Sequence, residues 1–402
     1  MRILFCNFEY PPLGGGGGVI NALLAQELAK RHDVTVLSSG GLDLPFESIE
    51  EGVQVIRAPV YFRKQQAVAN LRSMLTFIPN GIRIGKQVLK QHHYDVINTH
   101  FVLPTGPVGN ALAGFAGIPN VLTVHGGDLY DPTKSLSPHL HLLLRMWVKY
   151  LLKHADLVVG QSKDTLNNMQ RFYAPKMVGL RIPLGIKPPD THIASRKFYG
   201  FGNDDILLVT VGRLVARKAV GQLISMMVRL KETRARLIII GDGPDEATLK
   251  AQVAARQLED KITFLGHVEE AEKFRLLRLC DLYVSTTQHE GFGLVFLEAM
   301  ACGLSVVCYN NGGQMDFLQD HASGFIVPLN DLSLFQKRCQ LLIDKPELRR
   351  KMGAHNKRRV GEFYIDQCAR RYEGVFNQLL EAKANGKKVL EVPMVQTASG
   401  FE

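Results

Sequence analysis

The sequence predicts an α/β protein that consists of two doubly wound parallel-sheet domains. Short apolar runs alternate with longer stretches at helical spacing, which is the pattern of parallel strands covered by helices. The length of 402 residues exceeds what one hydrophobic core usually serves. A proline-rich segment, residues 182–189, separates two series of strand candidates and predicts the connection between the domains.

Each half of the chain carries its own series of strand candidates. In the first half they are Ile3–Phe8, Val34–Ser38, Val53–Ile56, Val96–Thr99, Val121–Val124 and Leu157–Gly160. In the second half they are Ile206–Val211, Arg236–Ile240, Ile262–Leu265, Leu282–Ser285, Ser305–Cys308 and Gly324–Val327. We therefore expect an N-terminal domain over 1–187 and a C-terminal domain over 188–364. Residues 365–402 should form a helix that crosses back to the N-terminal domain, followed by a polar tail.

The composition excludes a disordered or fibrous chain, because 46% of the residues are hydrophobic and only 21% are charged. No stretch of 18 apolar residues is present, so we expect no membrane-spanning helix. The six cysteines include no Cys-x-x-Cys pair, which predicts reduced, mostly buried thiols in a cytoplasmic protein.

The net charge of +10 is concentrated in part of the N-terminal half. Residues 51–100 hold 7 basic and 2 acidic residues, with the cations interleaved among apolar side chains. One interpretation is that residues 62–90 make a peripheral contact with an anionic membrane, and the other is a solvated face of core-packing helices. The cations in question are Arg63, Lys64, Arg72, Arg83, Lys86 and Lys90.

Five consecutive glycines, Gly14–Gly18, lie between the first strand and a helix expected over Val19–Arg31. Such a loop lets backbone N–H groups approach a phosphate closely. A nicotinamide-binding domain would also need an acidic residue at the end of the second strand, where this chain has Leu37-Ser-Ser-Gly-Gly41. The glycines therefore favour a phosphate contact of another kind, with a flexible surface loop as the alternative.

Two cations, Arg213 and Lys218, follow the strand at Ile206–Val211, five residues apart. On a strand-to-helix loop at the carboxyl edge of a sheet they could converge on one anion, for which a diphosphate is the obvious candidate. Solvated loop charges are the alternative.

The sharpest motif is residues 286–300, in which a strand leads through Gly-Phe-Gly into a helix. The turn leaves backbone amides free to bind an anion at the helix N-terminus. Glu290 precedes the turn and Glu298 lies roughly two helical turns further on, and carboxylates accept hydrogen bonds from sugar hydroxyls. The segment therefore predicts a site for a sugar and a phosphate together. Its amides are those of Phe292, Gly293 and Leu294.

Together these motifs resemble those of the retaining glycosyltransferases of family 4, which have the GT-B fold. The resemblance covers about residues 1–380 and rests on the Glu-x7-Glu pair, the Gly-Arg-Leu-x3-Lys element at 212–218, the glycine pair and the Thr-x-His-Gly element. It implies two Rossmann-like domains that face each other across a cleft, with the acceptor on the N-terminal domain and the nucleotide-sugar donor on the C-terminal domain. The chain departs from the family pattern at Ala219, at Asp316 and in the segment 183–186.

The resemblance also assigns roles to individual residues. It implies that Glu290 contacts donor-sugar hydroxyls, that Glu298 holds the ribose and that the nucleotide base is read by backbone near Val268. It implies that the diphosphate is met by Arg213, Lys218, Gly15 and Gly16, and that His125 lies near the donor sugar. His100, which ends a strand, is either an acceptor contact or a structural histidine.

The expected activity is transfer of a hexose from a UDP- or GDP-sugar to a glycan, a lipid-linked or another hydroxyl acceptor, in cell-envelope polysaccharide or glycoconjugate synthesis. The resemblance implies retention of anomeric configuration and no cofactor besides the nucleotide-sugar co-substrate. No metal is expected, since cations and helix dipoles can neutralise the leaving group and the chain has no Asp-x-Asp.

The alternatives are a catalytically silent nucleotide-sugar sensor and a non-hydrolysing sugar-nucleotide epimerase. A nucleic-acid partner is not expected, because the basic excess lacks aromatic interleaving on strands.

Overall fold

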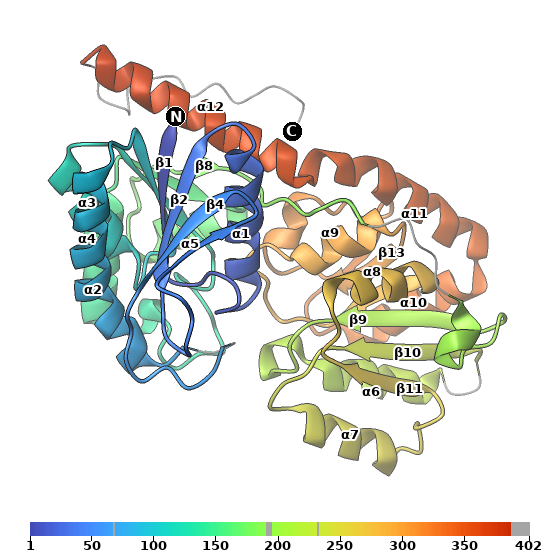
Figure 1. The fold of residues 1–402 in the computed structure, drawn as a ribbon. Helices are drawn as coiled ribbons and strands as arrows, with labels where there is room; N and C mark the ends of the chain where they lie inside the picture. The colour runs from blue at the N-terminus through green and yellow to red at the C-terminus, as the bar shows by residue number, and fades with distance from the viewer. Residues whose placement is uncertain (67–68, 190–194, 231–232, 387–402) are drawn as a thin grey trace. The chain divides into compact units, whose positions relative to one another are not determined.

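The computed structural model describes residues 1–66, 69–189, 195–230 and 233–386, and the chain forms two compact units (Figure 1). Unit 1 comprises Met1–Gly185 together with the chain from Ile365 onward, and unit 2 comprises Ile186–Tyr364. Each unit holds a largely parallel sheet between helices, which confirms the predicted α/β class. The polar tail expected after the last helix lies outside the described residues from position 387.

The sheet of unit 1 has eight strands in the order β3-β4-β2-β1-β5-β6-β7-β8. The strands are β1 (Arg2–Asn7), β2 (Asp33–Ser39), β3 (Glu47–Glu50), β4 (Val53–Ala58), β5 (Val96–His100), β6 (Asn120–Val124), β7 (Leu157–Gly160) and β8 (Leu180–Arg181). All neighbours pair in parallel except β3 with β4. The six predicted strands are confirmed to within two residues. The prediction missed the two edge strands, because β3 is polar and β8 has only two residues.

The helices of unit 1 are α1 (Gly16–Ala29), α2 (Leu71–Gln91), α3 (Gly106–Ala116), α4 (Leu142–Lys153), α5 (Lys163–Phe172) and α12 (Ile365–Ala384). α2, α3 and α4 pack in series, while α12 packs on α1 (Figure 1). The hydroxyls of Tyr372 and Thr123 lie 3.0 Å apart, and Glu373 lies 2.6 Å from the His32 ring, so α12 is fixed by polar contacts as well as by apolar ones. The first helix begins earlier than predicted, because Gly16 and the two glycines after it adopt helical backbone.

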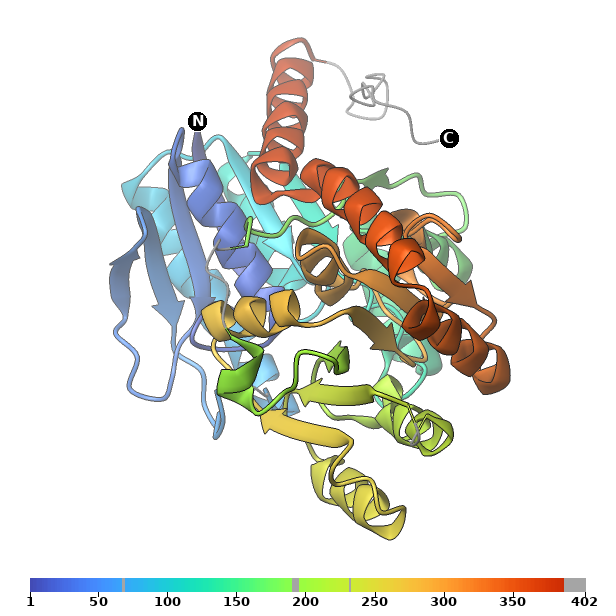
Figure 2. The same cartoon turned by 90° about the vertical axis from the view of Figure 1, so that its right-hand side faces the viewer.

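The sheet of unit 2 has six parallel strands in the order β11-β10-β9-β12-β13-β14, all confirmed to within one residue of the prediction. They are β9 (Ile206–Val211), β10 (Ala235–Ile240), β11 (Ile262–Gly266), β12 (Leu282–Ser285), β13 (Ser305–Tyr309) and β14 (Gly324–Val327). The helices are α6 (Val220–Arg229), α7 (Glu246–Ala255), α8 (Glu270–Leu279), α9 (Leu294–Ala301), α10 (Leu332–Asp344) and α11 (Pro346–Arg359). α6 contacts α7 and α10, and α9 contacts α8 and α11, so the two groups cover opposite faces (Figure 2).

Each sheet has a point at which the direction of winding reverses. In unit 1 this point lies between the adjacent strands β1 and β5, and in unit 2 it lies between β9 and β12. The loops that leave two such strands diverge, and the crevice beyond their carboxyl ends is where ligands bind in open α/β sheets. The glycine run follows β1, and the two strongest motifs of unit 2 follow β9 and β12.

The cysteines agree with the expectation of reduced, mostly buried thiols. All six are free, and only Cys302 is partly accessible. Among the described residues, no helix combines the length and the apolar character that crossing a bilayer requires.

The packing of α3 predicts opposite effects for the same substitution at two of its glycines. A Cβ at Gly109 would collide with the side chain of Thr99, whereas the space beside Gly114 is open. Gly109→Ala should lower the free energy of unfolding by about 1–3 kcal/mol through overpacking. Gly114→Ala should raise it by about 0.5–1 kcal/mol, because alanine loses less backbone entropy in a helix. Urea unfolding of the two variants measures both, and equal effects would contradict this packing of α3 on β5.

Candidate functional site

A buried carboxylate joins the two loops that flank the winding reversal of unit 2. Glu290, on the loop after β12, forms an ion pair with Lys218, on the loop after β9. Arg217 Nη1 lies 3.3 Å from the other carboxylate oxygen, and the hydroxyl of Thr287 donates to Glu290 Oε1 at 3.2 Å. Both oxygens of Glu290 are therefore engaged within the chain.

The two cations decide the ionisation of Glu290. Burial alone would raise the pKa of this carboxyl, but Lys218 and Arg217 lower it to about 2. Because the charged form is this strongly favoured, Glu290 is an anion at every physiological pH.

Backbone geometry fixes the loop that carries Glu290. The amide of Gly313 donates to the Glu290 carbonyl at 2.7 Å, and Arg217 donates to the carbonyl of His289. Gly312 has φ 122°, and a Cβ there would collide with the Glu290 backbone. The loops after β9, β12 and β13 are thereby locked together.

The helix that follows Glu290 begins as the sequence predicts. Gly293 caps α9 with φ 93°, a left-handed conformation that favours glycine. The first amides of a helix have no partner within it, so the amides around Leu294 offer donors and a positive dipole end. Phe292 is buried against Phe317, which anchors the turn.

Glu298 lies on α9, and only one of its two carboxylate oxygens has a hydrogen-bond partner among the described residues. Its Oε1 accepts from Lys273 of α8 at 2.7 Å, whereas its Oε2 is buried and has no hydrogen-bond partner in the described part of the chain. Burial raises the pKa of this carboxyl, Lys273 opposes that rise and Glu270 adds to it. A buried acceptor without a partner is uncommon in folded proteins and is suited to a ligand hydroxyl.

The remaining predicted residues of unit 2 lie on the same edge of the sheet. Val268 is half-buried in the loop between β11 and α8, the helix that carries Lys273. Arg213 is exposed, and the cation that joins Lys218 at Glu290 is Arg217 instead. A contact of Arg213 and Lys218 with one shared anion stays a prediction. Arg217 was not predicted, although its place next to Lys218 in the sequence was a usable signal.

In unit 1 the glycine run follows β1, and the side-chain carboxylate of Glu9 contacts it. Glu9 Oε2 accepts from the amide of Gly15 at 3.2 Å, and Gly16 begins α1. Burial raises the pKa of Glu9, while the Gly15 amide and the charges of Arg63 and Lys134 lower it. Glu9 was not predicted, because nothing in the sequence shows that its side chain folds back over the loop.

His125 belongs to a buried network at the carboxyl edge of the same sheet. Its Nε2 lies 3.0 Å from His100 Nδ1, and its ring stacks on Phe101 with centroids 4.3 Å apart. Its amide donates to Asp128 at 3.0 Å, and its carbonyl accepts from Gln161 at 2.8 Å. The structure therefore places His100 next to His125, a contact that the sequence did not predict.

Asn98 and Thr123, which extend this network beyond His100, decide the direction of its hydrogen bonds. Thr123 donates to the Asn98 carbonyl oxygen at 3.4 Å, so the Asn98 amide nitrogen, 2.9 Å from His100 Nε2, is the donor to that ring. His100 then carries its proton on Nδ1 and donates to His125 Nε2. Burial lowers the pKa of both rings, with the neighbouring His125 contributing at His100, and the pKa of His125 falls to about 4.

The segment 62–90 is only partly a surface. Arg63 is buried and donates to the Gln66 carbonyl at 2.8 Å, and Phe77 belongs to the core. Arg63 is therefore a structural residue, contrary to its inclusion among the surface cations. Phe62 and Arg72 are exposed, while residues 67 and 68 lie outside the described part of the chain.

Comparison with known families agrees with this arrangement. Residues 14–187 match the family described as Glycosyltransferase Family 4, and residues 192–359 match Glycosyl transferases group 1. The chain belongs to glycosyltransferase family 4.

Individual relatives of this family 4 glycosyltransferase match over almost the whole chain. N-acetyl-alpha-D-glucosaminyl L-malate synthase of Bacillus anthracis is 25% identical over 94% of this chain and 97% of its own length. Sucrose-phosphate synthase from Thermosynechococcus elongatus has a TM-score of 0.83 at 21% identity and covers 95% of this chain and 100% of its own. Anabaena HepE, solved with UDP and glucose, has a TM-score of 0.75 at 19% identity, with coverages of 94% and 99%. The GT-B fold expected from the sequence is confirmed.

The buried histidines of this glycosyltransferase predict a loss of stability in mild acid. An unfolded histidine titrates near pH 6.5, while His125 and His100 stay neutral in the fold, so the unfolded chain binds more protons as the pH falls from about 7 to 4. Burial raises the pKa of Asp128 to about 6, an effect of opposite sign that offsets part of the loss between about pH 6 and 4. The two histidines outweigh the single carboxyl, so this network is less stable at pH 5 than at pH 7.

Thermal unfolding of variants isolates this contribution. His100→Gln should flatten the dependence of Tm on pH between 5 and 7 by about 2–4 °C, since about 1 kcal/mol shifts Tm by that amount in a unit of this size. His93→Gln makes the same substitution at an exposed histidine and serves as the control. A His100→Gln slope that equals the wild-type slope would contradict the assignment of two buried neutral rings.

Proposed function

We propose that this protein is a retaining glycosyltransferase that moves a hexose from a UDP- or GDP-sugar to a hydroxyl acceptor. The observation that carries the proposal is the group of residues at the winding reversal of unit 2. There Glu290, on the loop that leads into the N-terminus of α9, pairs with Lys218 from the loop after β9. Glu298 of α9 has a buried oxygen without a partner among the described residues. One edge of the sheet thus offers groups for a sugar, a diphosphate and a ribose.

The proposed donor lies along this edge of unit 2. Glu298 Oε2 accepts a hydrogen bond from a ribose hydroxyl, and the backbone near Val268 meets the base. The diphosphate binds the cations and the α9 amides. The N-terminus of a helix carries only a partial positive charge, and the cations supply the rest of the charge that a diphosphate needs. The groups on the diphosphate are Arg213, Lys218, Phe292, Gly293 and Leu294. The UDP and glucose bound by HepE support a donor of this chemical class.

Glu290 has two roles in this proposal. Without a donor it compensates the charge of Lys218 and Arg217, and with a donor it shares Lys218 with the diphosphate while its oxygens accept from sugar hydroxyls. Its low pKa keeps it an acceptor throughout.

The proposed reaction takes place on one face of the sugar. The bond between C1 and the leaving phosphate oxygen breaks, the acceptor oxygen bonds to C1 on the same face, and the acceptor proton passes to that phosphate oxygen. Negative charge grows on the leaving group, and the preorganised cation and amides stabilise it without a metal ion.

The acceptor is proposed to bind unit 1, with His125 next to the donor sugar. Gly15 and Gly16 are proposed to approach the diphosphate from this unit. A glycan or lipid-linked acceptor in cell-envelope polysaccharide synthesis fits a cytoplasmic enzyme with peripheral membrane contact. The exposed part of residues 62–90, including Phe62 and Arg72, supports that contact.

Loss of Lys218 should abolish most of the activity. Lys218→Ala removes a cation from the leaving group and should lower kcat by about 10² or more, by analogy with deletion of one oxyanion donor. Lys250→Ala, at an exposed ion pair of the same unit, is the matched control and should leave kcat unchanged. Transfer is measured with the nucleotide-sugar that ligand-dependent unfolding identifies as the donor. NMR of the wild-type product should show the same anomeric configuration as the donor. Unchanged turnover in Lys218→Ala would refute the site, and an inverted product would refute retention.

Ligand-dependent unfolding identifies the donor and tests Glu298. A ligand at 100 times its Kd adds about 2.7 kcal/mol to the free energy of unfolding. One nucleotide class among UDP, GDP, ADP and their sugar conjugates should raise Tm in the wild type and in the control Glu246→Ala, which changes a half-buried carboxylate on α7. The shift should be smaller in Glu298→Ala, which lacks the ribose acceptor. An equal shift in Glu298→Ala would refute the ribose assignment, and no shift with any nucleotide would refute the donor site.

A further inference from the structure

One helix of unit 1 presents apolar and cationic side chains to solvent together. α4 buries Val148, Leu151 and Leu152, and its opposite face is exposed. That exposed face carries large apolar residues at helical spacing: Leu143 is 80% exposed, Met146 60% and Tyr150 55%. We call the exposed face of α4, together with the pocket described below, the α4 surface.

The cations of α4 lie beside its apolar stripe. Arg145, Lys149 and Lys153 are all exposed, at a spacing of four residues, so they follow the stripe along the helix. No aspartate or glutamate occurs between Asp131 and Asp156. An apolar stripe flanked by cations, with no acidic residue, is the pattern of a helix that lies in the interface of an anionic membrane.

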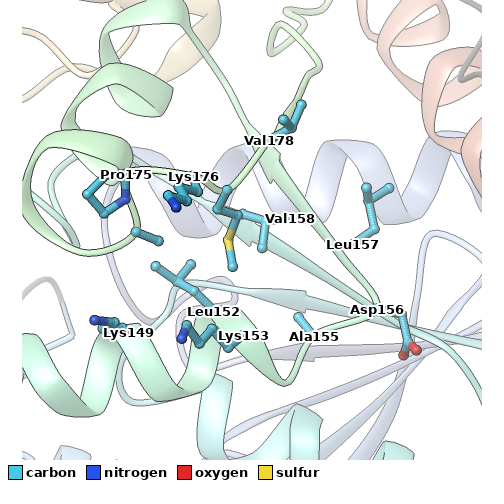
Figure 3. A pocket seen from close by; sticks show the side chains of 12 residues that line it. Lys149, Leu152, Lys153, Ala155, Asp156, Leu157, Val158, Pro175, Lys176 and Val178 are labelled. Atoms are coloured by element: carbon cyan, nitrogen blue, oxygen red, sulfur yellow. The ribbon is translucent and has the colours of Figure 1, made fainter. Parts of the chain in front are cut away.

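A pocket continues this surface beyond the end of α4 (Figure 3). It encloses about 540 Å³ between the helix and the segment that precedes β8. Leu152, Val158 and Val178 line it together with Lys149, Lys153 and Lys176 (Figure 3). Asp156, the one acidic residue in the lining, accepts from the amide of Asn120 at 2.8 Å.

We propose that the α4 surface docks this protein on an anionic phospholipid bilayer. Leu143, Met146 and Tyr150 enter the headgroup region, while the lysines face lipid phosphates. Charge complementarity identifies the occupant, because an apolar face alone would fit a second protein equally well, whereas cations along the whole stripe fit a surface of phosphates. α4 is 12 residues long and lies flat over about 18 Å, enough to cover several headgroups.

This surface is distinct from the exposed part of residues 62–90. α2, α3 and α4 pack in series on unit 1, so both surfaces belong to one helical layer. α4 has the continuous apolar stripe, whereas α2 turns Phe77 and Ile84 into the core. We therefore expect α4 to contribute more to binding than α2.

Vesicle sedimentation of the full chain tests the proposal. Wild-type protein should sediment with phosphatidylcholine vesicles that contain phosphatidylglycerol but not with phosphatidylcholine alone, and less so as salt rises above about 0.15 M. Lys149→Glu with Lys153→Glu should weaken binding at least tenfold, since each lysine near an anionic surface contributes about fivefold. Leu143→Ser with Met146→Ser should also weaken it at least tenfold, through loss of apolar burial.

Matched variants on α2 complete the experiment. Leu71→Ser with Leu75→Ser changes two exposed apolar residues of that helix and should keep most of the binding. Because all four apolar positions are exposed, the variants should unfold at the wild-type Tm, which is checked first. Sedimentation uses no donor or acceptor, so its outcome is independent of whether transferase activity is found.

Several outcomes would overturn the proposal. These are wild-type protein that does not sediment with anionic vesicles, α4 variants that bind as tightly as the wild type, and loss of binding in the α2 variant alone. Protein that is retained on DNA but not on vesicles would point to a nucleic acid. A wild-type dimer that dissociates on Leu143→Ser with Met146→Ser would show that a second copy of the chain covers the stripe.

Discussion

The ion pair between Lys218 and Glu290 is the interaction on which the architecture of unit 2's site depends. It ties the loop after β9 to the loop after β12, where the winding of the sheet reverses and the two loops would otherwise diverge. Because the carboxylate is buried, a missing partner would leave an uncompensated charge, which costs more than an intact pair contributes. Arg217 and the bridge to Gly312 then fix where α9 begins.

The sequence is sufficient to predict the fold because the information is local and strong. Every strand of unit 2 is a short run rich in apolar residues, and all of them except the edge strand β11 are mostly buried. Their short length and the helical segments between them identify such runs as strands. The missed strands lack that signal: β3 reads Glu-Ser-Ile-Glu at an antiparallel edge, and β8 pairs over two residues. The early start of α1 was missed because a glycine run has low helix propensity, and tertiary packing overrides that preference.

The candidate site is predictable only where its residues are close in sequence. The turn before α9 specifies its own geometry, so Glu290, Gly293 and Glu298 could be found from their spacing alone. Contacts over longer separations could not be found in this way. Arg217 rather than Arg213 reaches Glu290 because the turn at 216–218 directs the side chain, and His100 meets His125 because β5 and β6 are neighbours. A sequence gives the strands but not which side chains meet across them.

The two glycine-bordered loops share a physical property. In unit 2 the carboxylate of Glu290 neutralises the cations proposed for a diphosphate, and in unit 1 the carboxylate of Glu9 accepts from the amide of Gly15. At both places a carboxylate of the chain itself therefore compensates the cation or amide that it contacts. A phosphate bound as proposed would displace or share a carboxylate, so its affinity would depend on how much more strongly the cation or amide binds the phosphate than the carboxylate. The proposed diphosphate would gain from this exchange, because it has more charge and more acceptor oxygens than one carboxylate.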